Sequence, residues 1–177
     1  MRYIGLFLSF LIITAIVSGG CHRTKLPKAV VETNMGTFVI TLYSKDAPNT
    51  VKNFMELSER KFYDGSIFPK AIKDNMVQGG DPRGDGNSTP GYIIAAEFNK
   101  RKNDKGAVGM AHGYDPNSAG CIFYICIAPA HDLDYKYTVF GKVTKGLDVV
   151  KKISEVPVDE DQKPLKPVYI IQVTIER

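Results

Sequence analysis

Short apolar stretches with a two-residue period, separated by turn residues, constrain the fold of this chain most strongly. In residues 37–43 (TFVITLY), Phe38, Ile40 and Leu42 fall on one side of an extended chain, which is typical of a half-buried strand. Similar stretches lie at residues 30–33, 92–98, 108–111, 121–127, 137–143 and 169–176, and Gly, Pro, Asp and Asn separate them. Short strands in this arrangement predict a closed barrel or a sandwich.

Two segments have the apolar spacing of helices instead. Residues 48–60 place Val51, Phe54 and Leu57 on one stripe, with Asn49 or Thr50 available as the N-terminal cap. Residues 147–156 repeat this spacing. Core packing explains both stripes without a cofactor. The pattern therefore predicts a mainly β (α+β) chain in which the sheet closes on itself.

Residues 1–20 have the features of a signal peptide. Arg2 precedes an uncharged apolar run at residues 4–17, which is shorter than the roughly 20 residues that a membrane span needs. The small residues Ser18, Gly19 and Gly20 follow this run, as signal cleavage requires. We therefore expect residues 1–20 to be removed from an exported protein.

Cys21 follows these small residues directly, and this order resembles a bacterial lipoprotein box. In such a box the cysteine receives diacylglycerol and becomes the new N-terminus. The resemblance implies a lipidated Cys21, a tether at residues 21–28 and a folded domain at residues 29–177, anchored to a membrane and facing the periplasm or the cell exterior. The box usually has an aliphatic residue where this chain has Ser18, so plain secretion with an unmodified Cys21 stays open.

The remaining composition excludes several classes of function. Without residues 1–20, which contain Arg2 and no acid, the net charge falls from +4 to +3, and no basic run predicts nucleic-acid binding. Cys121 and Cys126 lie on one strand-like stretch, about 16 Å apart, which is beyond disulfide reach. We therefore expect buried free thiols. No C-x-x-C pair and no His/Cys cluster predicts a metal site.

The glycine-rich segment at residues 79–86 resembles known motifs only superficially. No Gly-Lys-Ser/Thr follows it, so it is not a phosphate-binding loop. The Arg-Gly-Asp string at residues 83–85 is expected by chance in a loop of this composition. No histidine has a serine or cysteine partner in a hydrolase signature. The sequence therefore shows no recognisable apparatus for hydrolytic chemistry.

Several longer strings occur in a fixed order: residues 47–54 (APNTVKNF), 62–68 (FYDGSIF), 77–82 (VQGGDP), 110–111 (MA), 116–117 (PN), 123–125 (FYI) and 137–143 (YTVFGKV). Together they resemble the cyclophilin family of peptidyl-prolyl cis-trans isomerases, from about Val31 to the C-terminus. The resemblance implies a closed eight-stranded antiparallel β-barrel capped by two α-helices. It also implies isomerisation of X-Pro bonds in proline-containing polypeptides without a cofactor. We expect the chain to be a monomer.

The resemblance also assigns roles to individual residues. The catalytic arginine of the family lies in a Phe-His-Arg string, which here reads Phe68-Pro69-Lys70, so Lys70 takes the catalytic position. Met76 matches a wall of the proline pocket, and Gln78 matches a polar group that contacts the substrate backbone. The residues assigned to substrate binding are Phe68, Asn75, Met76, Gln78, Ala111, His112, Ile122, Tyr124, Leu133 and Tyr137.

Several of these positions depart from the family pattern. Lys70 keeps the positive charge of arginine but lacks the planar fork that holds two acceptors together. The other departures are Asn75 and Tyr124 in place of phenylalanine, Ile122 in place of glutamine, His112 in place of asparagine, and Asp132 beside Leu133. We therefore expect an isomerase of reduced activity that assists folding outside the cytoplasm. The alternative is a non-catalytic module that binds proline peptides or proteins on the same scaffold, with Lys70 an ordinary solvated lysine.

Overall fold

The computed structural model describes residues 25–177. The predicted signal peptide, the lipidation site Cys21 and residues 22–24 of the predicted tether lie outside the described residues. The first strand begins at Lys28, so the last residue of the predicted tether belongs to the folded domain. Between residues 25 and 177, none of the helices has the length and apolar character that a membrane span requires.

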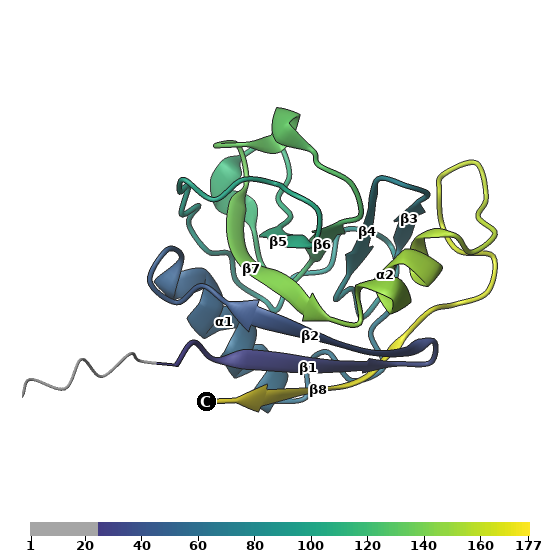
Figure 1. The fold of residues 1–177 in the computed structure, drawn as a ribbon, viewed down its shortest axis with the longest axis horizontal. Helices are drawn as coiled ribbons and strands as arrows, with labels where there is room; N and C mark the ends of the chain where they lie inside the picture. The colour runs from purple at the N-terminus through teal and green to yellow at the C-terminus, as the bar shows by residue number, and fades with distance from the viewer. Residues whose placement is uncertain (1–24) are drawn as a thin grey trace, which may run out of the picture.

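One antiparallel sheet of eight strands forms the body of the molecule (Figure 1). The strands are β1 (Lys28–Thr33), β2 (Gly36–Leu42), β3 (Lys70–Ile72), β4 (Met76–Gly79), β5 (Ala107–Met110), β6 (Phe123–Cys126), β7 (Thr138–Lys145) and β8 (Ile170–Glu176). Their order in the sheet is β3-β4-β6-β5-β7-β2-β1-β8. The helices are α1 (Pro48–Glu59) and α2 (Leu147–Ser154), with short 3-10 helices η1 (Pro116–Ser118) and η2 (His131–Leu133). The mainly β fold with two α-helices is thus confirmed.

The expectation of a closed barrel is wrong, because the sheet is an open half-barrel with β3 and β8 as its two edges. Other segments occupy the positions where these edges would meet. The amide of Ala71 in β3 donates to the carbonyl of Gln162 (2.9 Å), which lies in the loop before β8. At the other edge, the amide of Gly65 donates to the carbonyl of Ile170 (2.8 Å). These contacts satisfy part of each edge without joining β3 to β8.

The N-terminus of α1 is capped differently from the prediction. The cap residue is Ala47, and the side chains of Asn49 and Thr50 do not cap the helix. Instead, the carboxylate of Glu97 accepts hydrogen bonds from the backbone amides of Asn49 (3.1 Å) and Thr50 (2.7 Å). Burial alone would raise the pKa of Glu97, but hydrogen bonds from the hydroxyl and amide of Thr50 and from the backbone and side-chain amides of Asn49 outweigh it and lower the pKa. A negative charge at a helix N-terminus is stabilising, so Glu97 stays ionised in this position.

The predicted strand at residues 92–98 is wrong. In this segment only Ile94 makes a sheet-like bridge, with Ala119. Glu97 fixes the rest of the segment in an irregular path, because its amide donates to the hydroxyl of Thr138 (2.8 Å) while its carboxylate faces α1. The apolar residues of this segment do not form one buried face, because Tyr92, Ile93 and Phe98 are exposed.

The two faces of the sheet carry separate apolar clusters. The inner face contributes Phe38, Ile40 and Leu42, as their alternation predicts, and packs with α1 and α2 into the main core. A second, smaller cluster lies on the other side of β4, β5, β6 and β7.

Cys121 and Cys126 are buried and free, as predicted, and burial raises the pKa of each thiol to about 12. Neither thiol is therefore a nucleophile near neutral pH.

Candidate functional site

A row of three polar side chains crosses three neighbouring strands. Lys70 of β3 pairs with Gln78 of β4, and Gln78 pairs with Tyr124 of β6. Residues that pair directly in an antiparallel sheet have their side chains on the same face, about 5 Å apart. The side chains of Lys70, Gln78 and Tyr124 therefore leave the sheet on the same, outer face. The register of the strands brings together three residues that are far apart in the sequence.

An apolar surface lies beside this row. It consists of the second cluster, in which Ala107, Tyr124, Cys126, Ala130 and Val139 are buried and Tyr43, Met76, Ala111, Leu133 and Tyr137 are partly exposed. We call the part of this surface formed by Met76, Ala111, Tyr124, Leu133 and Tyr137 the slot. The rings of Tyr124 and Tyr137 meet edge to face, with their centres 5.7 Å apart. The structure therefore brings together five of the predicted substrate-binding residues.

Tyr124 fits the slot only because the residue beside it is a glycine. Gly109 of β5 pairs with Tyr124 of β6. A Cβ atom at position 109 would overlap the Cζ and hydroxyl atoms of Tyr124, so the ring lies flat across the backbone of β5. The ring is 2 % exposed and forms the floor of the slot.

Lys70 is half-buried and lines a hollow of about 460 Å³ together with Pro69, Gln78, Asp161 and Lys163. Within the part of the chain that the structure describes, it forms no ion pair. The neighbouring Lys163 donates to the carbonyl of Gly84 (3.1 Å). This hydrogen bond joins the loop before β8 to the glycine-rich segment at residues 79–86, here called the glycine loop. The carboxylates of Asp85 and Asp161 line the same hollow without forming an ion pair with Lys70.

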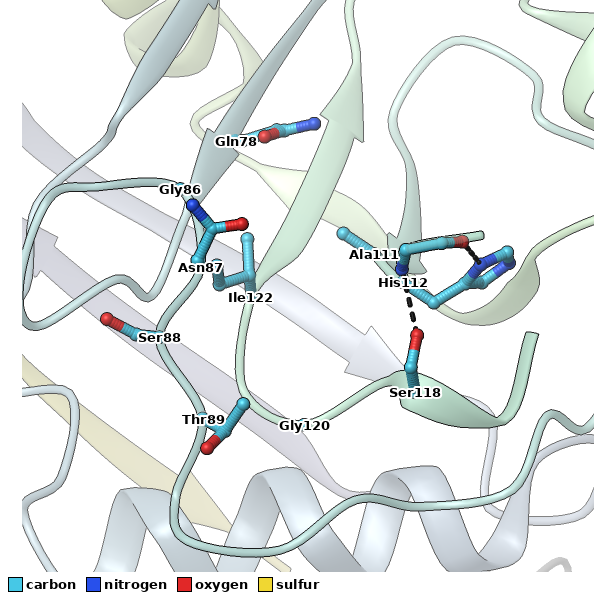
Figure 2. Close-up of a pocket in the computed structure, with 11 residues that line it drawn as sticks. Gln78, Gly86, Asn87, Ser88, Thr89, Ala111, His112, Ser118, Gly120 and Ile122 are labelled. Carbon is cyan, nitrogen blue, oxygen red and sulfur yellow. Dashed lines mark hydrogen bonds between the residues drawn. The ribbon is translucent and has the colours of Figure 1, made fainter. Parts of the chain in front are cut away.

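A second hollow, of about 390 Å³, also includes Gln78 in its lining (Figure 2). Ile122 and Asn87 line one side of it, and Ala111 and His112 line the opposite side. Gln78, Gly86 and Asn87 line both hollows, so the two hollows adjoin at these residues.

The buried carboxylate of Asp81 shapes the glycine loop that borders this hollow. It accepts hydrogen bonds from the amides of Gly86 (2.6 Å) and Arg83 (3.1 Å) and from the hydroxyl of Ser88. Gly80, with a φ of 83°, allows the chain to turn beside β6, where a Cβ atom would lie 2.8 Å from the carbonyl oxygen of Cys121. One side chain thus satisfies three donors of the loop.

His112 lies at the rim of the slot, and both of its ring nitrogens have partners. Nδ1 is 2.7 Å from the carbonyl oxygen of Gly113, and Nε2 is 2.9 Å from that of Lys136. The imidazole also stacks on Tyr137, with the ring centres 4.2 Å apart. The ring therefore joins the segment after β5 to the segment before β7.

Two predicted binding residues lie away from the slot. Phe68 is 1 % exposed and belongs to the main core, where its Cε1 atom would be 2.8 Å from a Cβ at Gly79. It supports β4 from the inner side of the sheet. Asn75 lies in the exposed turn before β4, and its carbonyl accepts a hydrogen bond from the amide of Ile127 (2.7 Å). Neither side chain lines a hollow beside Gln78.

Two residues that support the slot, Asn103 and Asp134, could not be identified from sequence patterns. The hydroxyl of Tyr124 donates to Oδ1 of the buried Asn103 (2.6 Å), and Nδ2 of Asn103 donates to Oδ1 of Asp134 (3.1 Å). The backbone amide of Asn103 also donates to this carboxylate, and this hydrogen bond contributes most to lowering the pKa of Asp134 to about 2. Between residues 25 and 177, no group of three or more His, Cys, Asp or Glu residues is arranged to hold a metal ion.

Comparisons with known proteins agree with this geometry. The family model described as "Cyclophilin type peptidyl-prolyl cis-trans isomerase/CLD" matches residues 28–175. The chain is 39% identical over 154 residues to the peptidyl-prolyl cis-trans isomerase CYP18-2 of Arabidopsis thaliana, covering 84% of this chain and 93% of that protein. It is 36% identical over 156 residues to the human peptidyl-prolyl cis-trans isomerase-like 1, covering 82% of this chain and 90% of that protein.

Solved structures give the same result. A cyclophilin type peptidyl-prolyl cis-trans isomerase of Cryptosporidium parvum superimposes with a TM-score of 0.82 at 30% identity, covering 86% of this chain and 98% of that chain. A second structure of that protein, determined in the presence of the dipeptide ala-pro, gives a TM-score of 0.81 over 85% of this chain and 99% of that chain. The similarity therefore extends over the whole sheet, both helices and the strands that carry the slot.

Proposed function

The chain belongs to the family of cyclophilin type peptidyl-prolyl cis-trans isomerases, and we propose that it isomerises X-Pro bonds with the slot as its proline pocket and Lys70 as its catalytic donor. The substrate class is polypeptides that contain proline. A related structure determined in the presence of the dipeptide ala-pro supports this substrate class.

The proposed mechanism follows from the nature of the barrier. Rotation about the X-Pro bond is opposed by about 18–20 kcal/mol of amide resonance. A donor that is directed at the prolyl nitrogen localises its lone pair and weakens the partial double bond. The slot would hold the pyrrolidine ring, Gln78 would bind the backbone of the peptide, and the ammonium of Lys70 would supply the donor. The order of Lys70, Gln78 and Tyr124 across three paired strands is the observation that carries this proposal.

We further propose that the activity is lower than that of relatives with an arginine at position 70. A guanidinium offers two parallel donors, whereas an ammonium acts as a point charge. Loss of one donor to a transition state reduces rates by about 100- to 1000-fold in well-studied enzymes. Ile122 lines the hollow beside Gln78 without offering a hydrogen bond, which weakens the hold on the peptide backbone further.

An isomerisation assay with a proline peptide tests this proposal. We expect Lys70→Ala to remove most of the acceleration and Lys70→Arg to increase kcat/KM by at least tenfold, because the fork is restored. Lys152→Ala changes an exposed lysine of α2 and serves as the matched control. The proposal fails if the wild-type protein does not accelerate exchange even at high concentration, or if Lys70→Ala is as active as the wild type.

We propose that the protein is exported and anchored by a lipid on Cys21. The order of a charged residue, an apolar run and small residues before Cys21 supports this. The first residue of β1, Lys28, is seven positions after Cys21, so the domain would lie within about 25 Å of the membrane. Mass spectrometry of the mature N-terminus checks the lipid, and Cys21→Ala should release the protein from the membrane fraction. A mature N-terminus with an unmodified Cys21 contradicts the anchor.

The alternative function is a binding module without catalysis. The replacement of the family's glutamine by Ile122 and of its arginine by Lys70 favours this alternative. In that case proline peptides would shift the NMR signals of Met76 and Tyr137 but would not speed cis-trans exchange. Exchange faster than in the free peptide would exclude the alternative.

A further inference from the structure

We propose that Asn103 is a positioning residue of the slot, which holds the floor residue Tyr124 and the wall residue Leu133 in a fixed relation. This inference rests on the proposed function, because it concerns how the slot recognises a pyrrolidine ring. Asn103 lies in the irregular segment between Asn99 and β5, outside every strand and helix. Its side chain would contact no substrate directly, since the residue is 0 % exposed.

The amide of Asn103 has a defined orientation. Its Oδ1 accepts the hydroxyl proton of Tyr124 at 2.6 Å, and its Nδ2 donates to Oδ1 of Asp134 at 3.1 Å. A hydroxyl that donates needs the oxygen end of an amide, and a carboxylate needs the nitrogen end. Both ends are therefore matched to their partners, and rotation of the amide by 180° would break both hydrogen bonds.

On the floor side, this hydrogen bond fixes the depth of the slot. The ring of Tyr124 lies between Gly109 below and the edge of Tyr137. Its hydroxyl is the only polar atom of the side chain, and Asn103 is its partner. Burial raises the pKa of Tyr124, so the hydroxyl remains a donor throughout the physiological pH range. A ring held at its outer end cannot tilt toward or away from a bound proline.

On the wall side, Asn103 holds both ends of η2. Its carbonyl accepts a hydrogen bond from the amide of Ala130 (2.8 Å), just before η2. Its backbone amide (2.8 Å) and its side chain both donate to Asp134, just after η2. Leu133, a wall of the slot, is the last residue of η2 and lies between these two attachments. The position of Leu133 therefore depends on Asn103.

A further contact keeps Asp134 available as an acceptor. Its Oδ2 is 3.2 Å from Nζ of Lys102 and 3.2 Å from Nδ1 of His131. Asp134 is nearly buried, and a buried carboxylate needs such partners to remain ionised. The network thus runs from Lys102 through Asp134 and Asn103 to the floor of the slot.

Loss of Asn103 should change the recognition of the ring more than the binding of the peptide backbone. The floor and the wall would no longer be coupled, whereas Gln78 and Lys70 would stay on their strands. Discrimination between proline and alanine depends on the fit of the ring in the slot. The ratio of the two affinities is therefore the quantity that reports a positioning role, because a general loss of folded protein changes both affinities equally.

The experiment compares two peptides that differ only in Pro or Ala at one position, titrated against the full domain and followed by NMR. We expect Asn103→Ala to reduce the ratio of the two affinities about tenfold. Tyr124→Phe keeps the ring but removes its hydroxyl, and it should reduce the ratio in the same direction. The double variant should be no worse than Asn103→Ala alone, because both changes break the same hydrogen bond.

Asn34→Ala is the matched control. Asn34 also joins two backbone segments, donating to the carbonyl of Pro167 (3.2 Å) and accepting from the amide of Tyr169 (3.1 Å), but it lies in the β1–β2 turn and does not contact the slot. It should leave the ratio unchanged even if stability falls. If the wild type prefers proline and folded Asn103→Ala and Tyr124→Phe keep that preference, the positioning role is overturned and the proposed function stands. If the wild type does not prefer proline, both are overturned.

Discussion

The pairing of Tyr124 with Gly109 shows how one side chain restricts its neighbour. The family has phenylalanine where this chain has Tyr124, and the additional hydroxyl extends over β5 to reach Asn103. Only a glycine at position 109 leaves space for the ring and its hydroxyl. The hydroxyl is therefore compatible with the fold because Gly109 has no side chain and Asn103 supplies an acceptor.

We expect Gly109→Ala to destabilise the domain by about 1–3 kcal/mol, since the added methyl group would overlap the ring of Tyr124. Thermal unfolding measures this loss. Gly113→Ala is the control, because its Cβ would only reach the hydroxyl oxygen of Ser118 at 3.4 Å. Equal unfolding temperatures for the two variants would show that the ring moves away without strain.

At the level of single residues, the sequence predicted which residues meet at the slot, but it did not predict which residues support the slot. The resemblance pointed to Met76, Gln78, Tyr124, Leu133 and Tyr137, and the structure places all five beside Lys70 or in the slot. Their roles in binding remain predictions. Asn103 could not be found, because it is 21 residues from Tyr124 and 31 from Asp134, and no motif or period links positions at such separations.

Among the elements, the N-terminus of α1 depends on Glu97, which lies almost forty positions after the end of the helix. Its stripe of Val51, Phe54 and Leu57 is buried, as the spacing predicts. Its N-terminus, however, is satisfied by Glu97 and not by a local cap. Local spacing was enough to identify the helix, because burial of one face is a periodic property. The cap could not be predicted, because it depends on the path of the irregular segment 92–98.

Replacing Glu97 with alanine should lower the stability by about 1–2 kcal/mol, because two backbone amides at the N-terminus of α1 lose their acceptor. Chemical denaturation gives the free energy of unfolding. Glu56→Ala removes a carboxylate from the same helix that pairs only with the exposed Lys52 at 3.8 Å, and it should cost less than about 0.5 kcal/mol. A similar loss in both variants would contradict the capping role.

For the whole molecule, the sequence patterns wrongly predicted that the sheet closes into a barrel. Residues 25–177 contain eight strands and two α-helices, and the apolar alternation correctly identified the inner face of β2. Whether the two edge strands meet depends on loop paths that alternation does not describe. Here Gln162, in the loop before β8, forms a backbone hydrogen bond with the edge strand β3. The segment before Phe68 forms backbone hydrogen bonds with Ile170 at the start of β8. The sheet is therefore a half-barrel completed by irregular chain.

The acid stability of the molecule should depend on Asp134. Hydrogen bonding from the backbone of Asn103 lowers the pKa of this carboxyl from 3.8 to about 2. A lowered pKa in the folded state means that the carboxylate stabilises the domain fully above about pH 4, and that this contribution is lost as the pH falls from 4 toward 2.

Unfolding by urea at pH 6 and at pH 2.5 checks this prediction. Wild-type protein should lose more stability between these two values than Asp134→Asn, which cannot titrate at that position. Asp148→Asn, on the first turn of α2, is a control for the general effect of removing one carboxylate. An equal loss in the wild type and in Asp134→Asn would show that other carboxyl groups carry the acid sensitivity.

The pairing of Lys28 with Glu176 places the two ends of the described chain on adjacent strands (Figure 1). A fluorescent protein fused after Arg177 would consequently emerge next to the segment that leads toward Cys21. In a lipid-anchored molecule this label would be held close to the bilayer, within range of energy transfer from a dye in the lipid. Removal of the anchor would abolish that transfer, so the geometry of one strand pair supplies a readout for membrane attachment in living cells.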